Sequence, residues 1–182
     1  MHFLTKRPNP LHFLYLLLGI SLATCTRPQQ TIESTENTYL RWVGDIEFDA
    51  AMDNPDFELC TDDSQIKQYF NDSQGLEYEG EKYTLERTIR DQYDTQKAKK
   101  ESGWLRIRFV VNCKGKTDRF RVIGADENYE ARDFHKSITD QLLNIAKSLD
   151  GWLPKTIDGQ QIDYYQYLVF KIEDGQLTEI LP

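Results

Sequence analysis

In Gly103-Trp104-Leu105-Arg106-Ile107-Arg108-Phe109-Val110-Val111, apolar and polar residues alternate. Every second residue from Leu105 to Val111 is apolar, which is typical of a β-strand with one buried face. The next stretch, Asn112-Cys113-Lys114-Gly115-Lys116, contains a glycine, the residue that a tight turn needs where the φ angle is positive. A second alternating run follows at residues 117–123, so the sequence predicts a β-hairpin.

A helix and a long strand are expected after this hairpin. Apolar residues from Phe134 to Leu149 recur at steps of three or four, which predicts a helix with one buried face. Gly151 stands where a glycine commonly caps a helix, and we expect Trp152 to fill the core. The aromatic and β-branched run at residues 162–172 predicts a strand that returns along the sheet.

The tail of the chain contains a second hairpin motif. The pair Asp174-Gly175 is typical of a two-residue turn between antiparallel strands. If this turn forms, Ile172 lies opposite Leu177, and Val169 lies opposite Ile180. The expected fold class is therefore α+β: a small antiparallel sheet covered by a helix, in the order β-β-α-β, with a possible extra strand at the C-terminus.

The first residues of the chain carry a targeting signal. Lys6 and Arg7 precede an apolar run that is too short for a comfortable membrane span, which predicts a signal peptide over residues 1–24. The stretch Leu22-Ala23-Thr24-Cys25 resembles a bacterial lipobox, in which Cys25 receives a lipid and becomes the first mature residue. An ordinary signal peptide and an uncleaved anchor are the alternatives, and both also take the chain out of the cytoplasm. We therefore expect a lipoprotein of the bacterial cell envelope, anchored in the lipid bilayer, in the outer membrane or periplasm.

Three parts are expected in the mature chain. Residues 25–38, which begin with the lipidated cysteine, are polar and predict a tether. Residues 39–102 are expected to be an N-terminal extension whose helices pack on the core, and residues 103–182 are expected to be that core. The whole chain has a formal charge of -8, which disfavours nucleic acid as a partner because an acidic surface repels phosphate.

Four motifs follow one another in the second half of the chain. They are the strand ending in Val110-Val111-Asn112, then Gly151-Trp152-Leu153-Pro154, the turn Asp158-Gly159-Gln160, and the aromatic strand ending in Phe170-Lys171-Ile172. Together they resemble the C-terminal domain of the TonB family of energy transducers, over roughly residues 66–172. The resemblance implies a helix on one face of an antiparallel sheet. It also implies binding to outer-membrane receptors, a short segment of which adds as a strand to an exposed sheet edge.

The aromatic strand is the edge to which such a segment would add. We therefore expect the partner-binding residues to be Tyr165, Tyr167, Val169 and Lys171. A strand formed by residues 177–181 would occupy the same edge, so these two expectations compete. A lipid anchor and a short tether replace the membrane helix and the long linker of a transducer, so we expect binding without energy transduction.

Two functions remain open. The first is a non-catalytic module that binds an outer-membrane or periplasmic protein through a sheet edge. The second is an accessory lipoprotein that binds a small ligand or glycan on an aromatic surface. The residues of that surface would be drawn from Trp104, Trp152, Tyr164, Tyr165, Tyr167 and Phe170.

Cys60 and Cys113 remain as a pair once Cys25 is lipidated. In an oxidising compartment this predicts a disulfide, with two buried free thiols as the alternative. We expect no metal site and no cofactor, because the sequence has no Cys-x-x-Cys and the mature chain keeps one histidine, His135. The sequence also contains no nucleophile-elbow or phosphate-loop motif, so we expect no catalytic residues and no enzymatic activity.

Overall fold

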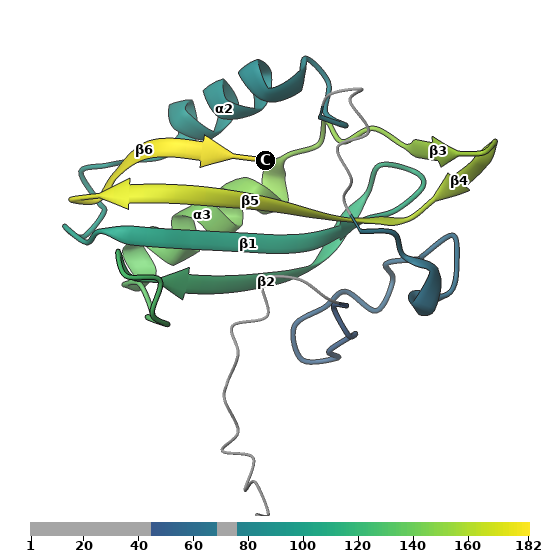
Figure 1. Ribbon diagram of the computed structural model, residues 1–182, viewed down its shortest axis with the longest axis horizontal. Helices are drawn as coiled ribbons and strands as arrows, with labels where there is room; N and C mark the ends of the chain where they lie inside the picture. The colour runs from purple at the N-terminus through teal and green to yellow at the C-terminus, as the bar shows by residue number, and fades with distance from the viewer. Residues whose placement is uncertain (1–44, 69–75) are drawn as a thin grey trace, which may run out of the picture. The chain divides into compact units, whose positions relative to one another are not determined.

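A four-stranded antiparallel sheet with the strand order β2-β1-β5-β6 forms the centre of the protein (Figure 1). The structure is a computed structural model, and it describes residues 45–68 and 76–182. The strands of this sheet are β1 (Gly103–Val111), β2 (Thr117–Ala125), β5 (Tyr164–Glu173) and β6 (Gln176–Leu181). The other elements are the 3-10 helix η1 (Asp63–Gln65), the helices α2 (Glu81–Gln92) and α3 (Lys136–Ser148), and the paired strands β3 (Lys155–Ile157) and β4 (Gln160–Ile162). The expected α+β class, including the extra C-terminal strand, is confirmed.

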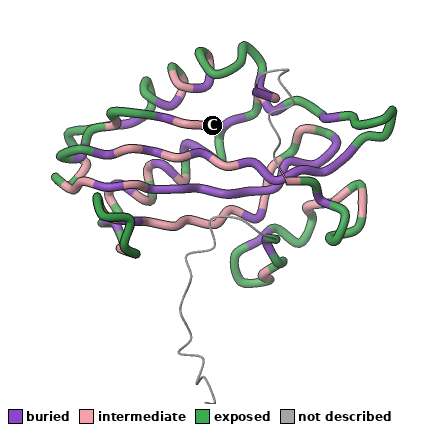
Figure 2. Tube along the Cα trace, viewed as in Figure 1, coloured by how far each residue is buried: buried purple, intermediate pink, exposed green. Residues whose placement is uncertain are grey.

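Helices α2 and α3 pack against one face of the sheet, which we call the helix face. Figure 1 shows α3 behind the strands, and Figure 2 shows that β1 is buried along most of its length. Leu105, Ile107 and Phe109 of β1 point to the helix face and are almost completely buried. They belong to one core with Leu85 of α2 and Leu142 of α3. The alternation that predicts β1 therefore also decides which of its side chains meet the helices.

A β-bulge in β2 sends two neighbouring side chains to opposite faces of the sheet. The pairing shifts by one residue between Arg108 and Val110, so both Arg119 and Phe120 lie opposite Phe109. Arg119 has a φ angle of 58°, in the left-handed region that non-glycine residues rarely adopt. The ring of Phe120 stacks on Phe109 in the core, with 5.0 Å between ring centroids. The bulge leaves the guanidinium of Arg119 on the other face.

Gly151 does not cap α3, so that expectation is wrong. The cap residue is Leu149, whose backbone is extended. Gly151 instead lies against the ring of Tyr78, where a Cβ atom would be 2.8 Å from the ring carbon Cζ. Trp152 is 3% exposed and packs edge-on against Tyr78, with 4.9 Å between ring centroids. Its expected place in the core is confirmed, and the glycine serves the close approach of Tyr78.

The C-terminal hairpin forms as expected, with one change of register. Asp174 and Gly175 both have positive φ angles, 49° and 78°, and Ile172 pairs with Leu177. The pairing then shifts by one residue between Lys171 and Ile172, so Val169 faces Leu181 and not Ile180. A bulge of this kind depends on packing over the whole hairpin, which the turn residues do not encode.

Residues 45–68, which we call the strap, pack on the face of the sheet opposite the helices. We call this the open face. Ile46 and Ile66 of the strap are buried against Val110 of β1 and Tyr165 of β5. The only helical turn in the strap is η1. In the described part of residues 39–102, the expected helices are therefore η1 and α2.

The expected signal peptide, Cys25 and the tether lie outside the described residues. No helix within residues 45–68 and 76–182 is both long enough and apolar enough to cross a bilayer.

Candidate functional site

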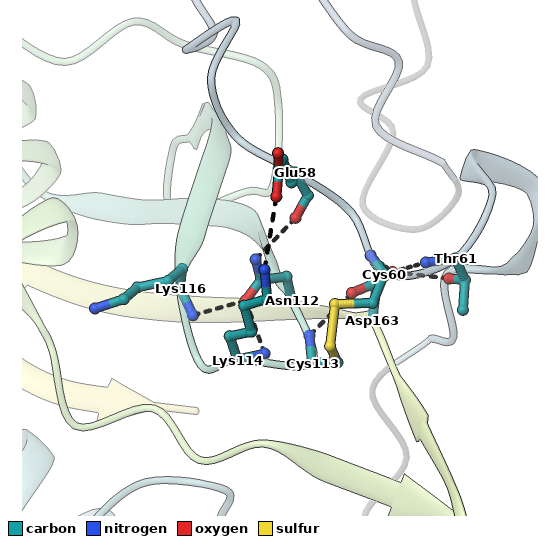
Figure 3. Close-up of a disulfide and its surroundings, with 8 residues drawn as sticks. All are labelled: Glu58, Cys60, Thr61, Asn112, Cys113, Lys114, Lys116 and Asp163. Atoms are coloured by element: carbon teal, nitrogen blue, oxygen red, sulfur yellow. Dashed lines mark hydrogen bonds and ion pairs between the residues drawn. A yellow bond between two sulfur atoms is a disulfide. The ribbon is translucent and has the colours of Figure 1, made fainter.

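A disulfide fastens the strap to the sheet, as the sequence predicts. Cys60 of the strap is bonded to Cys113, which follows β1, and the two Cα atoms are 6.0 Å apart (Figure 3). Cys113 is buried, whereas Cys60 is exposed. The bond joins positions that are 53 residues apart and fixes the strap over one end of the open face.

The carboxylate of Asp163 organises the two ends of this disulfide. One of its oxygens, Oδ2, accepts hydrogen bonds from the backbone amides of Cys60 and Thr61 and from the Thr61 hydroxyl, each at 2.8 Å. The other, Oδ1, accepts one from the amide of Cys113 at 2.9 Å. Asp163 is fully buried, and these donors replace the water that a buried carboxylate would otherwise need. It therefore joins the strap, the end of β1 and the start of β5.

Cys60, Cys113 and Asp163 form the one cluster of potential metal ligands found in the described part of the chain. Their ligand atoms lie within 4.8 Å of one another. Metal ions bind thiolates, however, and both sulfur atoms are used in the disulfide. The two oxygens of Asp163 already accept four hydrogen bonds. In this oxidised form the cluster is suited to holding the strap.

Asn112 ties the β1–β2 turn to the strap as well. Its Nδ2 group donates to the carbonyl of Glu58 at 2.8 Å (Figure 3). Its Oδ1 atom accepts from the amides of Lys114 and Lys116 at 3.0 and 2.9 Å, which shapes the turn. A single asparagine side chain thus couples the conformation of the turn to the position of the strap.

Ion pairs hold the rest of the strap on the open face. Both terminal nitrogens of Arg121 bond the carboxylate of Asp53, each at 2.7 Å, and the Asp53 side chain is 1% exposed. These hydrogen bonds hold the pKa of Asp53 below its usual range, although burial opposes them. Arg119, turned to this face by the bulge, pairs with Asp63 and donates to the carbonyl of Ile46 at 3.4 Å.

The four residues expected to bind a partner all project onto the open face, but they differ in accessibility. Tyr165 is 2% exposed under the strap, and its hydroxyl accepts a hydrogen bond from the amide of Ile46 at 3.3 Å. The guanidinium of Arg106 lies 4.3 Å from the ring centroid of Tyr167. Val169 and Lys171 pair with β6 through their backbones. A segment that adds at this edge of β5 would have to displace β6.

The hairpin that carries β6 is itself anchored. Arg90 of α2 donates to the carbonyls of Leu177 and Thr178 at 2.6 and 3.5 Å, on the outer edge of β6. The Tyr93 hydroxyl donates to the carbonyl of Gly175 at 3.0 Å, and the Gly175 amide donates to the carbonyl of Glu101 at 2.9 Å. Side chains that cap edge carbonyls in this way prevent another strand from pairing there.

The edge of β2 is different. The amide of Arg132 donates to the carbonyl of Gly124 at 3.1 Å, on the side of β2 that faces away from β1. Because every second residue of a strand points its N–H and C=O groups to the same side, those of Val122 also point away from β1. Among the described residues, no hydrogen bond partner of these two groups is found. The stretch of β2 edge with unpaired backbone groups is short, because the carbonyl of Phe120 accepts a hydrogen bond from the Arg121 side chain at 3.0 Å.

Most of the expected aromatic surface is core. Tyr164 and Phe170 are at most 1% exposed, so a ligand cannot reach them, and that part of the expectation is wrong. Trp152 is 3% exposed, in agreement with its expected place in the core. Trp104 instead stacks with Tyr129, with 6.0 Å between centroids and 18° between the ring planes. Tyr129 is 66% exposed and comes from the loop after β2, a position for which the sequence gives no periodic signal.

Groups that often act in catalysis have structural partners here. His135 is the residue before α3, and its Nδ1 atom accepts a hydrogen bond from the amide of Ser137 at 3.1 Å. Glu77 forms an ion pair with Lys155 at 2.9 Å. The Ser137 hydroxyl lies 2.9 Å from the same Nδ1 atom of His135, and it accepts a hydrogen bond from the amide of Lys99 at 3.1 Å.

No protein-family model, curated protein or solved structure matches this chain. Its function is therefore inferred from the strap, the strand edges and the exposed aromatic pair.

Replacing Cys60 and Cys113 together by serine is expected to lower the free energy of unfolding by about 4 kcal/mol, because the disulfide limits the entropy of the unfolded chain. Denaturant unfolding of wild type and variant measures this difference. Reductant should shift the wild-type midpoint and leave the variant unchanged. A wild-type midpoint that does not respond to reductant, or an alkylated cysteine pair in the unreduced protein, contradicts the prediction.

Asp53→Asn is expected to cost about 3 kcal/mol of unfolding free energy at neutral pH, because Arg121 loses its charged partner. The folded pKa of Asp53 is lowered, so its stabilisation is complete above the unfolded pKa of about 3.9 and is lost as pH falls through the folded value. The difference between wild type and variant should therefore shrink in acid. A difference that stays constant from neutral pH into this acidic range contradicts the assignment.

Proposed function

We propose that the chain is a non-catalytic lipoprotein of the bacterial cell envelope whose α+β domain binds another envelope protein through a sheet edge. The observation that carries this proposal is that the outer edges of the sheet differ in how far their backbone groups are paired. β6 pairs with residues 169–173 of β5, and Arg90 caps the carbonyls of Leu177 and Thr178 on β6, whereas the outward backbone groups of Val122 in β2 are left open. An open strand edge is a template for pairing with another chain.

The disulfide supports the envelope location. Bonds of this kind persist outside the reducing cytoplasm, and the sequence motif ending in Cys25 predicts export and lipid attachment. The short polar tether then holds the domain close to the bilayer, within reach of outer-membrane or periplasmic proteins.

The resemblance to the C-terminal domain of the TonB family supports strand addition as the binding mode. In this chain the aromatic strand β5 lies between β1 and β6. We therefore assign the partner to β2 in preference to the backbone of Val169 and Lys171. Lys171 and Tyr167 remain candidates for side-chain contacts from the open face.

A ligand-binding accessory protein is the second candidate function. The stacked pair of half-buried Trp104 and exposed Tyr129 favours it, because flat aromatic rings offer a large contact area to a sugar ring. The Nζ atom of Lys171 lies 5.8 Å from the Trp104 ring centroid and would add a hydrogen bond donor beside the rings. This candidate predicts small-molecule binding without a protein partner.

Cys25→Ala is expected to leave the chain unprocessed or to release it from membranes, since the variant cannot receive a lipid. Membrane fractionation and the intact mass of the chain measure both effects. A Cys25→Ala protein that matures and pellets like the wild type rules out the lipoprotein assignment.

A photoreactive residue at Val122 is expected to crosslink a discrete envelope protein in native cells, identified by mass spectrometry. Thr178, on the capped edge of β6, is the matched control and should give no such adduct. Parallel sites at Tyr167 and Lys171 test the open face. Adducts from these two sites alone, or no protein adduct together with sugar binding at Trp104, would refute binding at β2.

A further inference from the structure

An apolar hollow lies directly beside the open edge of β2. It has a volume of about 340 Å³ and lies between β2, residues 132–134 of the loop that joins β2 to α3, and the first turns of α3. Leu105, Val122 and Phe134 supply its apolar walls. Leu105 and Phe134 are 1% and 7% exposed, so the walls belong to the rigid core.

The position of the hollow matches the geometry of an added strand. Val122 lines the hollow with its side chain and presents its free N–H and C=O groups at the adjoining edge. Alternate side chains of a strand paired with β2 would point to the helix face, where the hollow lies. One apolar side chain would therefore enter the hollow while the main chain bonds Val122. The short open stretch limits the pairing to a few residues.

The charges around the hollow restrict the partner further. Two of the three exposed charged residues on its rim are acidic, Asp133 and Asp140, against one lysine, Lys136. Arg132 also lines the hollow, but it forms an ion pair with Glu101 at 3.1 Å. The whole chain carries a formal charge of -8. Both the rim and the chain as a whole thus disfavour an acidic segment.

We propose that the β2 edge and this hollow bind an extended segment of neutral or positive charge that carries an apolar side chain at the position facing the hollow. This inference rests on the proposed function and specifies its partner. The backbone of Val122 provides affinity, the hollow selects an apolar side chain, and Asp133 and Asp140 select against acidic neighbours.

A fluorescein-labelled peptide of alternating valine and lysine is the probe, measured by fluorescence anisotropy with the full mature chain. A valine–glutamate peptide of equal length is the charge control and should bind at least about tenfold more weakly, given the several kcal/mol that like-charge contacts cost. A lysine peptide with proline at alternate positions is the backbone control and should not bind, because it lacks the needed amides. Equal binding of the lysine and glutamate peptides overturns the proposal.

Two variants locate the site independently. Val122→Pro removes the outward amide, a change that an edge strand tolerates, and Thr139→Trp fills the hollow from α3. Each variant should bind the lysine peptide about threefold to tenfold more weakly, which corresponds to the loss of one hydrogen bond or apolar contact. Thr178→Pro, at the capped edge of β6, should have no effect. Binding that neither Val122→Pro nor Thr139→Trp weakens overturns the proposal.

The outcomes also separate this inference from the proposed function. A cellular adduct at Val122 with no preference for the lysine peptide refutes the chemistry of the segment and leaves strand addition standing. A crosslinking scan without an adduct at Val122 refutes both.

Discussion

The buried carboxylate of Asp163 is the point on which the arrangement of the sheet and the strap depends. Four donors from the strap and from the end of β1 converge on its two oxygens, beside the Cys60–Cys113 disulfide. These hydrogen bonds offset the cost of burying the carboxylate. The bonds in turn fix where the strap lies, so that Asp53 meets Arg121 and Ile46 meets Tyr165. The open face is thereby occupied at one end by the chain itself.

This occupation decides which surfaces are left for other molecules. The strap covers one end of the open face, and β6 with Arg90 closes the edge beyond β5. Among the surfaces that the strap and β6 leave open are the edge of β2 at Val122 and the aromatic pair of Trp104 and Tyr129. We propose the first for an added protein strand and the second for a flat ligand.

Local sequence patterns predicted the helices, strands and turns, whereas contacts between residues far apart in the chain decided the bulge and the position of the strap. The alternation in Gly103–Val111, the helical spacing before Leu149 and the Asp174-Gly175 turn need only neighbouring residues, and each formed as expected. The bulge at Arg119 and the position of the strap depend on partners more than 50 residues away in the chain. For the same reason nothing in the sequence singled out Asp163, although the cysteine pair beside it could be predicted from the compartment.

The ion pairs of arginines on the open face bear on the charge selectivity that we propose for the edge of β2. The chain has a formal charge of -8, and Arg119 and Arg121 form ion pairs with Asp63 and Asp53 of the strap. Each guanidinium charge is therefore balanced by a carboxylate of the strap, although Arg121 also donates to the carbonyl of Phe120 at the edge of β2. If the strap were absent, the same arginines would attract acidic segments to the sheet. By balancing these two charges, the strap favours the neutral or basic segment that we propose for this edge.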